Sequence, residues 1–178
     1  PVTEIVALDN NGEKLRRGQA LLSTWGLDAP SLSEASFAPR IVTLEADAAA
    51  TGLDDASFDV IVVDAPCSGT GTIRRRPEIK WRLSPKAVDE LLALQVRIQD
   101  EAVRLLKPGG VLIWIVCSLL QEEGPGAADA LQARHADLKP RALRSADAKR
   151  WEQAPGRYEV FAPDEAGDGF YLCAFERA

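Results

Sequence analysis

Two cysteines and an aspartate stand where apolar segments of the chain give way to turns. Residues 57–71 read SFDVIVVDAPCSGTG, so an apolar run ends in Asp64 and Cys67 follows within a turn of small residues. Cys117 ends the next strongly apolar run, VLIWIVCS. A thiolate is a nucleophile that can form a covalent intermediate, and a nearby carboxyl group can move a proton. We therefore interpret Asp64, Cys67 and Cys117 as parts of one active site.

The alternative for any cysteine is a small core residue, because cysteine is among the most buried residue types. We assign that role to Cys173, in the middle of FYLCAFE, whereas Cys67 lies in a polar turn. The spacing of the cysteines fits neither a zinc site nor a disulfide framework, and His135 lacks ligand partners at useful spacing. We expect no metal and a reducing, cytoplasmic location.

The elements that position these side chains alternate between strands and helices. Ser84 is the expected N-cap of the longest helix, Pro85 its first residue, and the Pro-Gly-Gly at 108–110 its end. Gly26 is expected to end the first helix. Strands are predicted at 4–9, 41–47, 58–64 and 111–118, helices at 11–25, 85–107 and 121–135, loops at 31–40 and 65–84, and a C-terminal antiparallel pair at 158–163 and 168–177. This order predicts an α/β fold whose sheet is mostly parallel, with strand 58–64 buried on both faces.

All four predicted parallel strands end in a polar or reactive residue, namely Asp9, Asp47, Asp64 and Cys117. Ligands of such sheets bind beyond the carboxyl ends of the strands, so we expect these side chains to cluster there. Asp9 and Asp47 could instead serve only to open turns and cap helices.

The charge of the chain is unevenly distributed. Its 178 residues carry a net charge of −6, which argues against a protein wrapped wholly around nucleic acid. Residues 72–86 nevertheless hold six basic residues and one acid, which suits one RNA or DNA segment, although a solvated surface loop is the alternative. No apolar run approaches the ~18 residues of a membrane span. The chain has no methionine and opens directly on a strand-like run, so we expect a piece of a longer protein or a chain whose start has been removed.

The motifs DAPCSGTGTIRRRPEIKW, LKPGG and VCS resemble those of the RNA 5-methylcytosine methyltransferases of the Fmu/Sun type, above all members that act on small-subunit ribosomal RNA. The resemblance covers nearly the whole chain and implies methyl transfer from S-adenosylmethionine to carbon 5 of a cytosine. It implies a Rossmann-like class I methyltransferase sheet, with residues 1–178 forming part of the catalytic domain. The first strand with its glycine-rich loop would be missing, so we expect these residues alone to bind the cofactor weakly or not at all.

The resemblance also assigns roles to individual residues. Cys117 would be the nucleophile, Cys67 would assist product release, and Asp64 would contact both cofactor and base. The cofactor would be held by Asp9 at the ribose, Lys14 nearby and Asp47 near the adenine; the RNA would meet Arg74, Arg75, Arg76 and Lys80. The family usually has threonine before the nucleophile, where this chain has Val116.

Other functions remain open at this point. The same chemistry could act on transfer RNA, or the chain could be a non-catalytic RNA-binding domain of the same fold. Methyl transfer to nitrogen would leave both turn cysteines without a purpose, and a thiol redox role lacks a Cys-x-x-Cys pair. The sequence implies RNA as a partner, with no membrane and no obligate protein partner.

Overall fold

The computed structural model describes residues 2–24, 39–161 and 167–178, and it divides into two compact units, Pro1–Thr51 and Gly52–Ala178. The expected helix end at Gly26, most of the loop at 31–40 and most of the link within the C-terminal pair lie outside the described residues. Each unit is described by itself. A single catalytic domain comprising both units stays a prediction.

The first unit is a parallel strand pair with one helix. Strand β1 (Glu4–Asp9) pairs in parallel with β2 (Arg40–Glu45), and α1 (Gly12–Thr24) lies between them in sequence. Asn11 caps α1, because its side-chain oxygen accepts hydrogen bonds from the backbone N–H groups of Glu13 and Lys14. The predicted strand–helix–strand order of this unit is confirmed.

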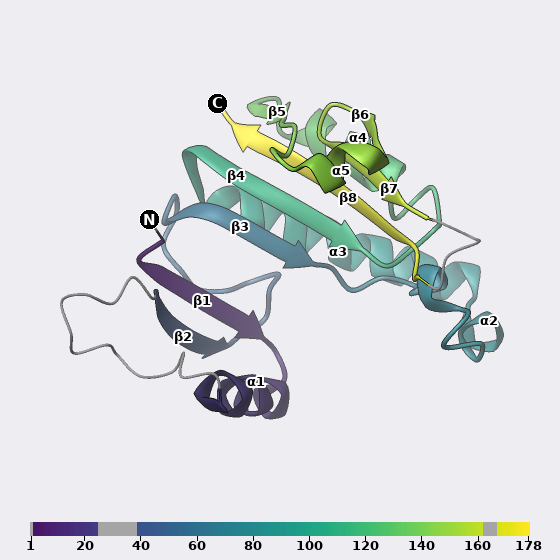
Figure 1. Cartoon of the computed structure of the whole chain (residues 1–178), viewed down its shortest axis with the longest axis horizontal. Helices are drawn as coiled ribbons and strands as arrows, with labels where there is room; N and C mark the ends of the chain where they lie inside the picture. Colours follow the sequence, from purple (N-terminus) through teal and green to yellow (C-terminus); the bar gives the residue numbers. More distant parts are fainter. Residues whose placement is uncertain (1, 25–38, 162–166) are drawn as a thin grey trace. The chain divides into compact units, whose positions relative to one another are not determined.

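The second unit contains a mixed sheet with the strand order β3-β4-β8-β7-β6 (Figure 1). Strands β3 and β4 are parallel, whereas β8 runs antiparallel to β4, to β7 and to the short β5. The strands are β3 (Phe58–Asp64), β4 (Leu106–Val116), β5 (Leu138–Pro140), β6 (Glu152–Ala154), β7 (Arg157–Val160) and β8 (Phe170–Arg177). The predicted α/β class and the antiparallel C-terminal pair, β7 with β8, are confirmed.

The longest helix begins as predicted and ends earlier than predicted. Helix α3 (Pro85–Leu105) has Ser84 as N-cap, whose side chain accepts a hydrogen bond from the N–H of Ala87. The assignment of Pro-Gly-Gly as the helix end was wrong, because Leu106 already pairs with Phe58 and residues 106–110 belong to β4. The other helical segments are η1 (Thr70–Thr72, a 3₁₀ turn), α2 (Ile79–Arg82), α4 (Pro125–Arg134) and α5 (Ala146–Trp151).

The core of the second unit lies on one face of its sheet. Leu112, Trp114 and Val116 alternate along β4 and are fully buried, and α3 runs along one face of β3 and β4 (Figure 1). On the opposite face, Val60 and Val62 of β3 are 55% and 60% exposed, so the prediction of a strand buried on both faces was wrong. Within the described residues β3 pairs only with β4, which leaves its other edge unpaired.

No helix in the described residues is long and apolar enough to cross a membrane.

Candidate active site

Cys67 and Cys117 are brought together by the parallel pairing of β3 and β4. Asp64 at the end of β3 is in register with Ile115, so the turn after β3 lies beside the end of β4. The two sulfur atoms are 3.4 Å apart, although 50 positions separate the residues in sequence. Both thiols are partly exposed and free, while Cys173 is fully buried, as predicted.

The two thiols have different surroundings. Burial, followed by the hydrogen bond and the charge of Cys117, raises the pKa of Cys67 to about 12, and the charge of Glu123 adds to this effect. Cys67 therefore carries its proton at neutral pH. The two sulfur atoms are within hydrogen-bond distance, and a hydrogen bond donated by Cys67 would stabilise a thiolate at Cys117, which is the nucleophilic form of cysteine.

The turn needs small residues because it passes very close to neighbouring backbone. The N–H of Gly71 donates to the carbonyl of Cys117 over 3.0 Å, and the N–H of Gly169 donates to the carbonyl of Gly71 over 2.8 Å. A Cβ atom at position 71 would lie 2.0 Å from the carbonyl oxygen of Gly169. Any side chain there would push the turn away from Cys117.

A buried polar network, which the sequence did not lead us to expect, fixes the turn in place. The carboxylate of Glu123 is fully buried and accepts hydrogen bonds from the N–H of Ser68 (2.8 Å) and its hydroxyl (2.5 Å). The hydroxyl of Ser118 lies 3.1 Å from the hydroxyls of Ser68 and Thr70. These bonds join the residues that follow Cys67 to the residues that follow Cys117.

Gln95 holds the other side of Cys67. Its side-chain amide is buried and donates to the carbonyl of Pro66 over 2.8 Å. Gln95 and Glu123 thus bind the residues immediately before and after Cys67. The sequence signal for Gln95 was a polar residue among apolar ones on a helix, whereas Glu123 lies among polar residues and glycine and gave no such signal.

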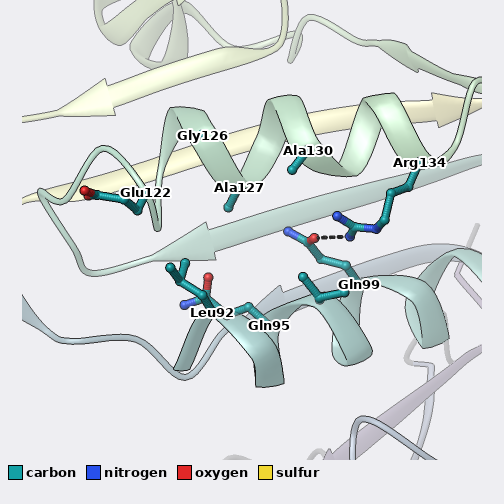
Figure 2. A pocket seen from close by; sticks show the side chains of 9 residues that line it. Leu92, Gln95, Gln99, Glu122, Gly126, Ala127, Ala130 and Arg134 are labelled. Atoms are coloured by element: carbon teal, nitrogen blue, oxygen red, sulfur yellow. Dashed lines mark hydrogen bonds between the residues drawn. The ribbon is translucent and has the colours of Figure 1, made fainter. Parts of the chain in front are cut away.

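A cavity of about 210 Å³ lies between α3 and α4, and Gln95 is one of the residues that line it (Figure 2). Gln99 also lines it and accepts a hydrogen bond from Arg134 over 2.7 Å, as Figure 2 shows. The other amide atoms, Oε1 of Gln95 and Nε2 of Gln99, have no hydrogen-bond partner within the described part of the chain. The cysteines do not line this cavity.

Asp64 lies at the carboxyl end of β3, as predicted, and its side chain is exposed. Val116, the residue in place of the family's threonine, is fully buried and points into the core.

Three of the four residues predicted to contact the cofactor, Asp9, Lys14 and Asp47, lie in the first unit, and the fourth, Asp64, lies in the second. Asp9 ends β1, and its carboxylate accepts from the N–H of Asn11 (2.8 Å) and forms an ion pair with Lys14 (3.4 Å). Asp47 follows β2 and accepts from the N–H of Ala49 over 2.9 Å. Because β1 and β2 are parallel, the Asp9 and Asp47 carboxylates share one edge of the pair.

The basic segment, residues 72–86, follows the Cys67 turn directly. Arg74, Arg76 and Lys80 are exposed. Arg75 instead forms an ion pair with Asp168, which raises the pKa of Arg75 and lowers that of Asp168. Arg75 therefore ties the segment to the residues before β8, a structural role beside the predicted one.

His135 is hydrogen-bonded to Asp100 over 2.8 Å. In the described ranges, no group of three or more His, Cys, Asp or Glu side chains is arranged to hold a metal ion.

Comparisons with known proteins identify relatives of this chain. The family described as 16S rRNA methyltransferase RsmB/F matches residues 2–176. Ribosomal RNA small subunit methyltransferase B of Shewanella oneidensis is 33% identical over 181 residues, which cover 100% of this chain and 38% of that protein. The chain thus spans little more than a third of that relative.

Solved structures show the same fold. The crystal structure of PH0851 matches with a TM-score of 0.81 and 25% identity, over 98% of this chain and 37% of that one. A methyltransferase homolog from Pyrococcus horikoshii matches with a TM-score of 0.74 and 21% identity, over 98% and 53%. Together, the motifs, the fold and the matched residues show that the chain belongs to the 16S rRNA methyltransferase RsmB/F family.

Proposed function

We propose that the protein transfers a methyl group from S-adenosylmethionine to carbon 5 of a cytosine in RNA, with small-subunit ribosomal RNA as the substrate. The observation that carries the proposal is the pair of thiols, Cys67 and Cys117, 3.4 Å apart at the ends of adjacent parallel strands. The names of the matched family and of its relatives, which refer to small-subunit ribosomal RNA, support the choice of substrate.

S-adenosylmethionine, when bound, supplies an electrophilic methyl group. The carboxylates of Asp9 and Asp47 suit its hydroxyl and amino groups, because carboxylates accept hydrogen bonds from both. Asp9 keeps 30% of its side chain exposed despite its pairing with Lys14, so it can accept further hydrogen bonds. In this proposal Lys14 orients the Asp9 carboxylate.

On the RNA, the Cys117 thiolate adds to carbon 6 of the cytosine, which makes carbon 5 nucleophilic. Asp64 would donate a proton to the ring nitrogen 3 in this addition and take it back when carbon 5 attacks the methyl group. After carbon 5 has been methylated, it loses its proton, the Cys117–carbon 6 bond breaks, and its electron pair returns to sulfur. The double bond between carbons 5 and 6 is thereby restored.

Cys67 would accept the proton from carbon 5 once its own proton has passed to solvent. Burial is the largest cause of the high pKa of Cys67, and the hydrogen bond and the charge of Cys117 come next. The contribution of Cys117 is absent while Cys117 is bonded to carbon 6, because a thioether is uncharged. The pKa of Cys67 should therefore fall during the intermediate by the part that Cys117 contributes.

The decisive experiment uses RNA that contains 5-fluorocytosine, together with S-adenosylmethionine and the full-length protein. Fluorine cannot leave as a proton does, so a covalent protein–RNA adduct should accumulate and survive a denaturing gel. Mass spectrometry should locate the attachment at Cys117. If RNA and cofactor both bind but no adduct forms, a non-catalytic RNA-binding domain or chemistry at nitrogen becomes the better account.

We expect the basic segment to contribute to RNA binding by neutralising phosphates. Replacing both Arg74 and Arg76 with serine should weaken RNA binding and lower the slope of log K against log salt by ~0.7 for each phosphate of single-stranded RNA that the variant no longer neutralises. The double variant keeps the pair between Arg75 and Asp168. Filter binding at several salt concentrations measures the slope.

The control for this prediction is Arg97→Ser, which removes an exposed charge from α3, outside the segment. Its slope should match that of the unmodified protein. Equal slopes for all three proteins would show that the segment is only a solvated surface.

A further inference from the structure

We propose that Trp81 is a stacking platform for an unpaired base of the RNA that lies beside the target cytosine. This inference rests on the proposed function and deepens it, because it names a contact to a base where the basic segment offers contacts to phosphates. It would mean that the protein recognises unpaired RNA around the modified position.

Trp81 is the most exposed of the large apolar side chains in the part of the chain that the structure describes, with 81% of its surface accessible. An exposed apolar residue is by itself ordinary. The position of this indole is unusual, because its backbone is held in place and the surrounding segment is strongly basic. These two features indicate which kind of ligand could bind to the indole.

The backbone under Trp81 is fixed by its neighbours. Ile79, two residues earlier on α2, is buried, and a Cβ atom at Gly69 would lie 3.3 Å from its Cδ1 atom. Helix α2 therefore packs against the Cys67 turn. The N–H of Leu83 donates to the carbonyl of Ile79 over 2.9 Å and closes the helix. The indole is thus presented at a defined place, close in the chain to the proposed catalytic turn.

The positive charge around Trp81 favours a negatively charged ligand. Lys80 and Arg82 flank it in sequence, and the Lys80 ammonium lies 5.0 Å from the centre of the indole ring. Residues 72–86 hold six basic residues and one acid within a chain of net charge −6. A ligand that offers both negative charge and flat aromatic faces is complementary to this arrangement, and unpaired RNA offers both.

Stacking and phosphate contacts have different signatures, which allows a direct test. Stacking of a base on an aromatic ring does not depend on charge, so its loss lowers affinity equally at all salt concentrations. We expect Trp81→Ala to weaken RNA binding roughly 5- to 100-fold. The plot of log K against log salt should shift in parallel, unlike that of the Arg74 and Arg76 double variant. Trp81→Phe should recover most of the affinity.

A double-mutant cycle with abasic RNA identifies the base. RNAs that lack a single base at successive positions around the target should bind the unmodified protein less well at one position. At that position Trp81→Ala should cause no additional loss. Trp151→Ala is the matched control, since Arg150 likewise lies over the Trp151 ring, at 4.6 Å, but outside the basic segment.

Affinity within twofold of the unmodified protein for Trp81→Ala would overturn the proposal. A loss that persists undiminished with every abasic RNA would overturn it too, because the indole would then not contact a base. Adduct formation at Cys117 is measured separately with 5-fluorocytosine RNA at saturating concentration. A failure of the stacking proposal is therefore distinguishable from a failure of the proposed function.

Discussion

Cys117→Ala should abolish methyl transfer while RNA binding persists, with the rate falling by about 10⁴-fold or more, as when the nucleophile of a covalent mechanism is removed. The physical reason is that without sulfur addition at carbon 6, carbon 5 of cytosine remains a poor nucleophile. Incorporation of labelled methyl groups into ribosomal RNA measures the effect. Cys117→Ala should also form no adduct with 5-fluorocytosine RNA.

The other two cysteines provide matched controls for that result. Cys67→Ala keeps the nucleophile and removes the proposed base, so adducts with ordinary RNA should accumulate. Cys173→Ala removes a fully buried thiol of β8 that has no part in the proposed chemistry, and it should keep full activity with a modest loss of stability. Unchanged activity in Cys117→Ala would rule out the covalent mechanism.

Glu123→Ala should have the largest effect on the shape of the site. The substitution leaves the N–H of Ser68 without its acceptor, and an unsatisfied buried group costs about 1–3 kcal/mol, whereas the Ser68 hydroxyl keeps the Ser118 hydroxyl 3.1 Å away. We expect a loss of about 1–3 kcal/mol in the free energy of unfolding, measured by chemical denaturation. Any molecule that remains folded should react slowly, because the Cys67 turn is no longer held beside Cys117.

Two further variants test whether the loss of stability comes from the buried hydrogen-bond acceptor at position 123 or from the loss of a negative charge. Glu123→Gln keeps an acceptor for the N–H of Ser68 and should lose only about 1 kcal/mol of stability. Glu122, the adjacent residue, is exposed, and Glu122→Ala should stay within ~0.5 kcal/mol of the unmodified protein. Equal stabilities for Glu122→Ala and Glu123→Ala would contradict the role that we assign to the buried carboxylate.

The parts of this protein that sequence predicts well are those set by local patterns. The cap at Ser84 and the strand ends at Asp9 and Asp64 follow from side-chain chemistry and apolar periodicity within a few residues. The proximity of Cys67 and Cys117 also followed, because parallel strands bring their carboxyl ends to one edge. The partners of Arg75 and Ser68, which are Asp168 and Glu123, could not be predicted, since they lie 93 and 55 positions away in sequence.

Two of the wrong predictions arose because distant residues determine which strands pair and which faces of a strand are covered. A Pro-Gly-Gly segment predicts a break, yet residues 106–110 are in strand β4, which begins where Leu106 pairs with Phe58. An unbroken apolar run predicts a strand covered on both faces, but the sequence of a strand does not say how much of each face is covered. Short elements such as α2 and β6 were missed because three or four residues carry too little periodicity.

The unpaired edge of β3, with Val60 and Val62 exposed beside it, has a consequence for the behaviour of concentrated samples. An edge strand with open N–H and carbonyl groups is a template on which another chain can form a strand, and nearby apolar side chains strengthen that association. These 178 residues, handled alone, should therefore aggregate as their concentration rises. A charged residue in place of Val62 should delay that aggregation, because like charges on stacked edges repel.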